Sequence, residues 1–157
     1  MSERPVVLVL SGPNLNLLGQ REPEIYGRET LDDHVAAMRR AADAAGFEVE
    51  HRQSNAEGEL IDAIHGARGR CAAIVINPGA FGHYAWGIHD ALAAFDGPVV
   101  EVHISNPSAR ESWRHTSVVA PVATGTIAGF GGHGYVLAIE ALRRLTAPGD
   151  RPPTLER

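Results

Sequence analysis

Three apolar runs constrain the fold of this chain more than any other feature. Residues 5–10 read PVVLVL, residues 72–76 read AAIVI, and residues 98–104, PVVEVHI, are nearly as apolar. Runs without polar alternation are typical of parallel strands that are buried on both faces of a sheet. Two shorter candidates, residues 47–50 and 125–130, complete a set of five expected strands.

Helical patterns fall between these runs. Thr30 to Asp33 resembles a capping box, and apolar residues then follow at helical spacing until Gly46, which predicts a helix between them. Similar spacing predicts further helices over 57–68, 84–95 and 133–146. Strands that alternate with helices imply right-handed βαβ units. The expected fold class is therefore α/β, with a flavodoxin-like, five-stranded parallel sheet and helices on both faces.

The length and the ends of the chain indicate a simple organisation. With 157 residues, the chain fits one domain, expected over residues 1–146, followed by a polar, Pro-rich and mobile tail over 147–157. No apolar run approaches the roughly 18 residues of a membrane helix, and no signal-peptide pattern opens the chain. The single cysteine, Cys71, excludes an intrachain disulfide framework. These features predict a cytoplasmic protein without a membrane partner.

The basic residues exclude several kinds of chemistry. The chain has 14 basic residues, all of them arginine, and a net charge of −5. Without lysine there is neither a Schiff-base mechanism nor a Walker-type phosphate loop. The acidic balance and the lack of basic clusters argue against a nucleic-acid partner. Six histidines show no metal-ligand spacing and are interpreted as surface or packing residues: His34, His51, His65, His89, His115 and His133.

Polar residues gather where the expected strands end. The stretches concerned are residues 11–16, SGPNLN, residues 77–79, NPG, residues 101–106, EVHISN, and residues 129–134, GFGGHG. Ligands of open parallel sheets bind at the carboxyl ends of the strands, so these stretches predict a site for a small polyhydroxylated or anionic ligand. Ordinary turn chemistry is the alternative for any one of them. The glycines of 129–134 follow the last strand, which favours helix–strand packing over a nucleotide loop.

A long connection precedes the first expected helix. Residues 17–28 read LLGQREPEIYGR and carry Arg21, Tyr26 and Arg28. Long loops in compact domains are often lids. Tyr26 is interpreted either as a rim or packing residue or, because a nearby cation favours the phenolate, as a base.

Several of these stretches together resemble the type II 3-dehydroquinate dehydratases. They are GPNLN (12–16), LGQREP (18–23), YG (26–27), RQSN (52–55), EGEL (57–60), INP (76–78), EVHISN (101–106), RESWRH (110–115) and GFGGHGY (129–135). The resemblance covers about residues 6–145 and implies a flavodoxin-like fold, a homododecamer of four trimers and no metal or organic cofactor. It also implies dehydration of 3-dehydroquinate to 3-dehydroshikimate, in aromatic amino-acid biosynthesis or in quinate breakdown. The unrelated class of dehydratases uses a Schiff-base lysine, which this chain lacks.

The resemblance also assigns chemical roles. Tyr26 matches the tyrosine base, and Arg21 would favour its phenolate. Asn14 matches the residue that helps to hold a water molecule against the enolate oxygen, and His103 matches the general acid. Glu101 lies on the same strand face as His103, where it would orient the imidazole or contact another subunit of the trimer.

Other positions match substrate contacts of the family. The residues that resemble a cradle for the carboxylate and the C1 hydroxyl are Asn77, Ile104 and Ser105. His83 and Arg114 match residues that hold the ring hydroxyls, with a surface histidine and a solvated arginine as the alternatives. Asp90 matches a residue that reaches into the site of a neighbouring subunit.

The chain departs from the usual family sequence at five positions, which are Ser11, Gly82, Tyr84, Ala85 and Trp86. Four of them flank His83, so they are expected to affect the shape of the pocket or the subunit contacts rather than the chemistry. Three hypotheses remain open. The chain is a type II dehydratase of 3-dehydroquinate, a divergent lyase of a related cyclohexane carboxylic acid, or a non-catalytic flavodoxin-like module that binds a nucleotide or flavin.

Overall fold

The computed structural model describes residues 3–147 and contains one parallel sheet. Its strands are β1 (Val6–Ser11), β2 (Glu48–Gln53), β3 (Ala73–Asn77), β4 (Val99–His103) and β5 (Gly125–Ala128). Their order in the sheet is β2-β1-β3-β4-β5. Every neighbouring pair is parallel, so the expected five-stranded α/β fold is confirmed.

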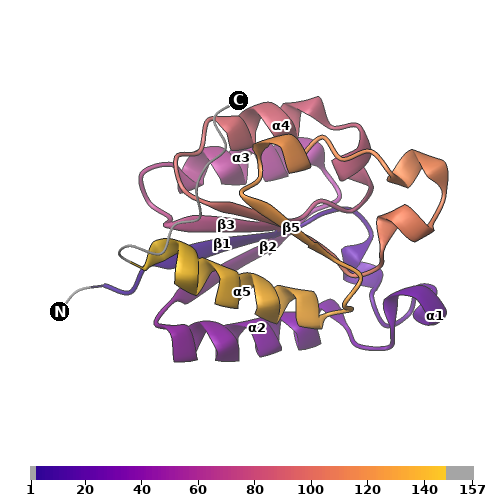
Figure 1. Cartoon of the computed structure of the whole chain (residues 1–157), viewed down its shortest axis with the longest axis horizontal. Coiled ribbons are helices and arrows are strands. Elements are labelled where there is room, and N and C mark those ends of the chain that lie inside the picture. Colours follow the sequence, from indigo (N-terminus) through magenta and orange to yellow (C-terminus); the bar gives the residue numbers. More distant parts are fainter. Residues whose placement is uncertain (1–2, 148–157) are drawn as a thin grey trace.

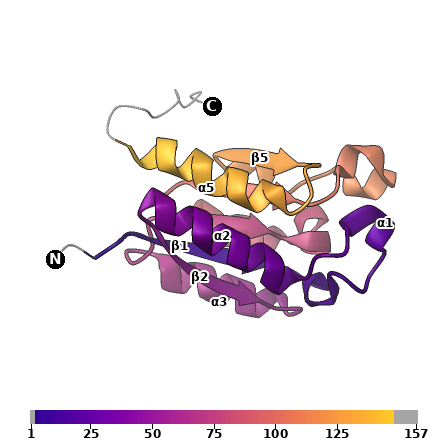
Figure 2. The same cartoon turned by 90° about the horizontal axis from the view of Figure 1, so that it is seen from below.

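Helices cover both faces of the sheet (Figures 1 and 2). They are α1 (Pro23–Tyr26), α2 (Leu31–Ala45), α3 (Glu57–Ala67), α4 (Trp86–Ala93) and α5 (His133–Thr146). Short 3-10 helices are η1 (Leu15–Leu17), η2 (Gly79–His83), η3 (Pro107–Ala109), η4 (Ser112–Arg114) and η5 (Ala120–Val122). Figure 1 shows α3 and α4 on one side of the sheet and α2 and α5 on the other.

Each face of the sheet has its own apolar core, as the apolar runs require. Val7 and Val9 of β1 pack with Met38 of α2 and Ile139 of α5. Leu8 and Leu10 pack instead with residues of α3 and α4. All four β1 residues are fully buried, because side chains of a strand alternate between faces and both faces here are covered.

The expected helix limits hold within one residue for α2, α3 and α5, although only α2 begins with a side-chain cap. Thr30 and Asp33 form the capping box at the start of α2, and Gly46 ends that helix with φ 83°. The expected helix over 84–95 was wrong in its limits, because α4 extends only over Trp86–Ala93. The long connection contains α1, which no sequence pattern indicated. Of the expected tail, all but residue 147 lies outside the described residues.

Close backbone packing joins the carboxyl ends of β1 and β3. The Gly12 amide donates to the Asn77 carbonyl at 2.8 Å, and a Cβ at Gly12 would lie 2.2 Å from the Pro78 carbonyl oxygen. Only glycine fits this approach. Figures 1 and 2 both place α1 and the chain that follows β4 at this same end of the sheet. Among the described residues, no helix is long and apolar enough to cross a membrane.

Candidate active site

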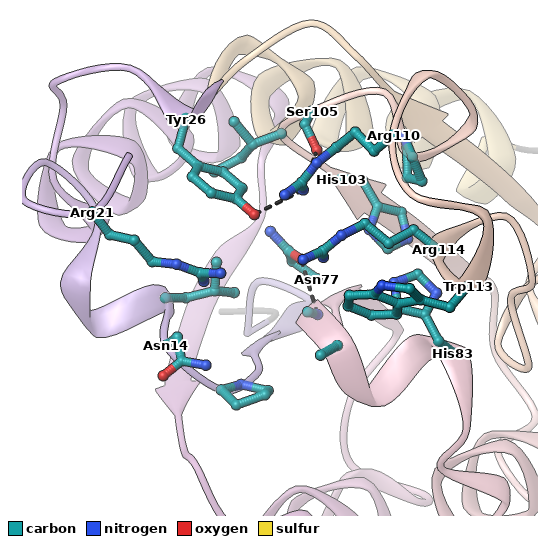
Figure 3. A pocket seen from close by; sticks show the side chains of 16 residues that line it. Asn14, Arg21, Tyr26, Asn77, His83, His103, Ser105, Arg110, Trp113 and Arg114 are labelled. Atoms are coloured by element: carbon teal, nitrogen blue, oxygen red, sulfur yellow. Dashed lines mark hydrogen bonds between the residues drawn. The ribbon is translucent and has the colours of Figure 1, made fainter. Parts of the chain in front are cut away.

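A cavity of about 270 Å³ lies at the carboxyl ends of β1, β3 and β4 (Figure 3). Nine of the residues expected at the site line it, namely Asn14, Arg21, Tyr26, Asn77, His83, His103, Ile104, Ser105 and Arg114. Pro13, Leu15, Gly79, Ala80, Pro107, Arg110 and Trp113 complete the lining. Residues that are far apart in the sequence thus meet around one cavity at the carboxyl ends of the strands, where ligands of open parallel sheets bind.

Glu101 lies behind the cavity wall and holds His103. Its side chain is fully buried, and its Oε2 lies 2.6 Å from His103 Nε2. The hydroxyls of Ser117 and Thr126 also donate to this carboxylate, at 2.8 and 3.3 Å. Because a carboxylate can only accept, the contact with Glu101 places a ring proton on His103 Nε2. The other ring nitrogen, Nδ1, has no hydrogen bond to any described residue. The imidazole is therefore fixed in orientation by a buried partner.

The Tyr26 hydroxyl contacts an arginine that the sequence analysis did not assign to the site. Arg110 Nη1 donates to the Tyr26 oxygen at 2.8 Å and to Ser105 Oγ at 3.1 Å. The guanidinium carbons of Arg21 and Arg110 lie 5.0 and 5.1 Å from the centroid of the Tyr26 ring, so both arginines contact the ring, and Arg110 also contacts the oxygen. Figure 3 shows the two arginines on opposite sides of Tyr26. A donor with full positive charge stabilises negative charge on the phenol oxygen.

The loop that carries Asn14 is held by the residues that follow β2. Asn14 has φ 67°, a left-handed conformation that asparagine tolerates better than most residues. The backbone N–H of Asn14 donates to Asn55 Oδ1 at 3.0 Å, and Gln53 Nε2 donates to the backbone carbonyl of Gly12 at 3.2 Å. The RQSN stretch, for which the resemblance implied no role at the site, thus supports the loop beside the cavity.

Asn77 is fixed from the inside of the protein. Its Nδ2 donates to the Tyr135 hydroxyl at 2.9 Å, and its Oδ1 accepts from the Gly79 amide at 3.2 Å. Burial raises the pKa of Tyr135, which keeps that hydroxyl protonated and able to donate in turn. Both sides of the carboxamide therefore have partners, which fixes its orientation.

His83, Trp113 and Arg114 form one wall of the cavity. His83 Nδ1 lies 2.7 Å from the Thr116 carbonyl oxygen, so the ring donates there and leaves Nε2 as an acceptor. The Arg114 guanidinium carbon lies 4.0 Å from the centroid of the Trp113 ring, and Arg114 Nε donates to Glu111 at 2.6 Å. One cation, Arg114, and one acceptor, His83 Nε2, are thus held at this wall.

Asp90 does not line the cavity. It is an exposed residue of α4, which leaves the cavity of a single chain without it. The five departures from the family sequence and the glycine-rich stretch 129–134 are also absent from the cavity lining. Within residues 3–147, no three His, Cys, Asp or Glu side chains are grouped so that they could hold a metal ion.

Comparisons with known proteins agree with this geometry. The family described as dehydroquinase class II matches residues 5–143. This chain belongs to that family. The 3-dehydroquinate dehydratase of Halalkalibacterium halodurans is 55% identical over 136 residues, which are 87% of this chain and 94% of that protein. The 3-dehydroquinate dehydratase 2 of Pseudomonas putida is 55% identical over 90% of this chain and 95% of its own length.

A solved structure gives the same result for the fold. The type II dehydroquinase from Propionibacterium acnes superposes with a TM-score of 0.85 and is 48% identical, covering 91% of this chain and 97% of its own. At this identity, the likeness extends beyond the flavodoxin-like fold to the family. The expected family is therefore confirmed, and the chain is a class II dehydroquinase.

Proposed function

We propose that this chain removes water from 3-dehydroquinate and forms 3-dehydroshikimate. The observation that carries the proposal is the Tyr26 hydroxyl, held by Arg110 at 2.8 Å in the same cavity that His103 lines. Glu101 lies behind His103 and holds its ring. A base and an acid at one cavity are what an elimination next to a ketone requires. The 3-dehydroquinate dehydratases named above support the choice of substrate.

Tyr26 is the base. Its phenolate removes a proton from the carbon beside the ketone, and the electron pair left on carbon moves onto the carbonyl oxygen to form an enolate. The positive charges of Arg110 at the oxygen and of Arg21 at the ring stabilise the phenolate before this step. Asn14 helps to hold a water molecule that donates to the enolate oxygen.

His103 is the general acid. As the enolate collapses, the C1 hydroxyl leaves with the Nδ1 proton of the His103 imidazolium, whose Nε2 proton stays in the hydrogen bond to Glu101, so that water and the conjugated ketone are the products. Glu101 is the positioning residue of this step, because its buried carboxylate fixes the ring by a 2.6 Å hydrogen bond. Before the next turnover, Tyr26 returns its proton to solvent and His103 takes up a proton at Nδ1.

The remaining lining residues hold the substrate. Asn77, Ile104 and Ser105 form the cradle for the carboxylate and the C1 hydroxyl, where backbone N–H groups at the end of β4 contribute. His83 and Arg114 bind the ring hydroxyls. The firm seating of Arg114 between Trp113 and Glu111 supports this role.

The complete enzyme is a homododecamer of four trimers in which Asp90 of one subunit reaches the cavity of its neighbour. The exposure of Asp90 on α4 is consistent with such a contact. Tyr84 and Trp86, at the same side, are 59% and 61% exposed, and large apolar surfaces of this kind mark interfaces. We further infer a single catalytic domain over residues 1–146, action in the cytoplasm, and catalysis without metal or organic cofactor.

None of the five departures from the family sequence lines the cavity. This favours 3-dehydroquinate over a related cyclohexane carboxylic acid as the substrate. It also favours a change at the surface of the subunit, where Tyr84 and Trp86 are exposed.

The test is an absorbance assay with 3-dehydroquinate, in which formation of the conjugated enone raises the ultraviolet absorbance. We expect turnover by the wild-type protein near neutral pH. The Tyr26→Phe variant should lose turnover about 10²–10⁴-fold while it still binds the substrate, because the ring stays and only the base is lost. Folded wild-type protein without turnover would refute the proposal, and normal turnover by Tyr26→Phe would refute the base assignment.

A further inference from the structure

Side chains from the end of β2 continue the hydrogen bonds of the sheet into the loop that carries Asn14. Ser11 and Gln53 are register partners at the ends of β1 and β2. Beyond them, Gln53 Nε2 donates to the backbone carbonyl of Gly12 at 3.2 Å. Asn55 Oδ1 then accepts from the Asn14 N–H at 3.0 Å and from Gln53 Nε2 at 3.2 Å. Side chains therefore hold the loop where the backbone ladder ends.

The backbone fixes the orientation of both carboxamides. The Gly12 carbonyl can only accept, so the Gln53 atom that faces it is Nε2. The Asn14 N–H can only donate, so the Asn55 atom that faces it is Oδ1. The same Oδ1 accepts the second Gln53 proton, so the two assignments agree with each other.

Asn14 needs this support because its backbone is strained. It has φ 67° and ψ −1°, and its side chain makes no capping hydrogen bond at the start of η1. A left-handed conformation in a residue other than glycine persists where the surrounding contacts enforce it. On the β3 side, the Gly12 amide donates to the Asn77 carbonyl at 2.8 Å. On the β2 side, the contacts are those of Gln53 and Asn55.

The two supporting residues lie outside the cavity that they serve. Asn14 lines the cavity (Figure 3), whereas neither Gln53 nor Asn55 belongs to the lining. The direction of a side chain follows the φ and ψ of its own residue. A relaxed backbone at Asn14 would therefore carry its carboxamide away from its place at the cavity.

We propose that Gln53 and Asn55 are positioning residues that hold Asn14 in its left-handed conformation and so keep its side chain at the cavity for formation of the enolate. The kinetic consequence rests on the proposed function, in which Asn14 helps to hold a water molecule against the enolate oxygen. Because this contact is made to charge that develops in the transition state, its loss should lower kcat and leave KM nearly unchanged.

Two variants that keep the shape of the side chain and add the same charge have opposite expected results. In Gln53→Glu, an oxygen replaces Nε2, so a carboxylate faces the Gly12 carbonyl and Asn55 Oδ1, which are both acceptors. In Asn55→Asp, the carboxylate faces the Asn14 N–H and Gln53 Nε2, which are both donors. In steady-state kinetics with 3-dehydroquinate, kcat should fall about five- to twentyfold in Gln53→Glu and stay within about twofold of wild type in Asn55→Asp. KM should stay within about twofold in both.

Two further variants separate positioning from general damage. Asn55→Leu removes the acceptor at an exposed position and should lower kcat about three- to tenfold. Asn14→Gly adopts the left-handed conformation without strain and has no side chain to misplace. Adding Gln53→Glu to Asn14→Gly should therefore change kcat by less than about twofold.

Three kinetic results would overturn the proposal. They are a wild-type kcat in both Gln53→Glu and Asn55→Leu, equal losses of kcat in Gln53→Glu and Asn55→Asp, and a full effect of Gln53→Glu in the Asn14→Gly background.

Crystal structures of the variants provide a readout that does not depend on the reaction. In the wild type and in Asn55→Asp, Asn14 should keep its left-handed conformation with its side chain at the cavity. In Gln53→Glu and Asn55→Leu, the Asn14 backbone should leave that conformation, or its side chain should turn out of the cavity. An unchanged Asn14 in both of these variants would overturn the proposal even if 3-dehydroquinate were not the substrate. Lack of turnover by the wild type would refute only the proposed function.

Discussion

The two halves of the cavity are attached to the protein in different ways. At the ends of β3 and β4, Asn77 and Glu101 are almost completely buried, and their hydrogen bonds run into the interior. Tyr26, in contrast, comes from a segment in which no residue between 20 and 30 is buried. Its hydroxyl is held by a single donor, Arg110, that approaches from the chain after β4.

This difference separates stability from activity. The sheet-borne half, formed by Asn77, Glu101 and His103, is part of the core, so a change there disturbs the fold as well as the chemistry. The loop-borne half, formed by Arg21 and Tyr26, contacts the core mainly through the Tyr26 ring. Changes in this half should affect turnover and leave the free energy of unfolding nearly unchanged.

The largest expected effect separates the two proton transfers. In His103→Ala, kcat should fall about 10²–10⁴-fold because the leaving hydroxyl loses its acid. The Tyr26 base remains, so the variant should still exchange the substrate proton beside the ketone with deuterated solvent. Tyr26→Phe should lose this exchange together with turnover. NMR of 3-dehydroquinate in deuterated buffer measures both, and loss of exchange in His103→Ala would contradict the assignment.

The contact between the halves should have the next largest effect. Arg110→Gln removes the charged donor from the Tyr26 oxygen, so kcat/KM should fall about 10²-fold. The melting temperature should change little, because the cation lies at the cavity and not in the core. Arg40→Gln, on the exposed side of α2, is the matched control. Wild-type kinetics in Arg110→Gln would show that the loop-borne half does not depend on this contact.

Much of the fold could be predicted because its signals are local. The apolar runs of β1, β3 and β4 identify central strands, and Thr30 with Gly46 brackets α2. The helix α1 could not be predicted, since it has four residues and follows Glu22 with φ 38°, a conformation that only the assembled loop stabilises. η2 likewise depends on the approach of Gly79 to Pro13, which the sequence does not reveal.

The site divides in the same way. The strand-end rule alone brings Asn14, Asn77 and His103 to one edge, and the structure confirms that they share a cavity. For Tyr26, the residues alone left a rim or packing residue and a base as alternatives. Only the resemblance favoured the base, because the path of a long loop has no periodic signal. Arg110 was missed as a site residue for the same reason, although it stood in the RESWRH stretch. The roles of these residues in catalysis stay predictions.

Alanine substitutions at two glycines compare how much the sheet-borne and the loop-borne half of the cavity contribute to the stability of the protein. Gly12→Ala would place a Cβ 2.2 Å from the Pro78 carbonyl oxygen, so overpacking of about 1–3 kcal/mol should lower the melting temperature by roughly 2–12 °C. Gly27, with φ 81°, has no atom within 4 Å of such a Cβ. Gly27 also has ψ −177°, a conformation that essentially only glycine adopts, so Gly27→Ala should strain the end of α1 and lower kcat/KM several-fold. Because no residue between 20 and 30 is buried, the loop can relax, and the melting temperature should fall less than in Gly12→Ala. Calorimetry measures the melting temperatures of the two variants, and steady-state kinetics measures their kcat/KM. Equal losses of melting temperature in Gly12→Ala and Gly27→Ala would contradict the comparison.

The smallest expected effect is a pH dependence of stability confined to the sheet-borne half. His34 is 4% exposed, stacks on Tyr135 at 5.9 Å between ring centroids, and so supports the side chain that holds Asn77. Burial lowers the pKa of His34, while Glu29 and Asp33 oppose this shift. The unfolded chain therefore binds the proton first as the pH falls, and stability that is present above about pH 6.5 is lost below it.

His34→Gln should remove this contribution and leave that of His51, whose pKa is also lowered. Between pH 8 and pH 5, the melting temperature of the wild type should therefore fall by roughly 2–4 °C more than that of His34→Gln. Differential scanning calorimetry at the two pH values measures the slope, which is independent of any constant loss of stability in the variant. Parallel slopes would mean that protonation of His34 is not linked to unfolding. Tyr26→Phe keeps His34, so its melting temperature should fall with pH as that of the wild type does, since the loop-borne half contributes no buried histidine.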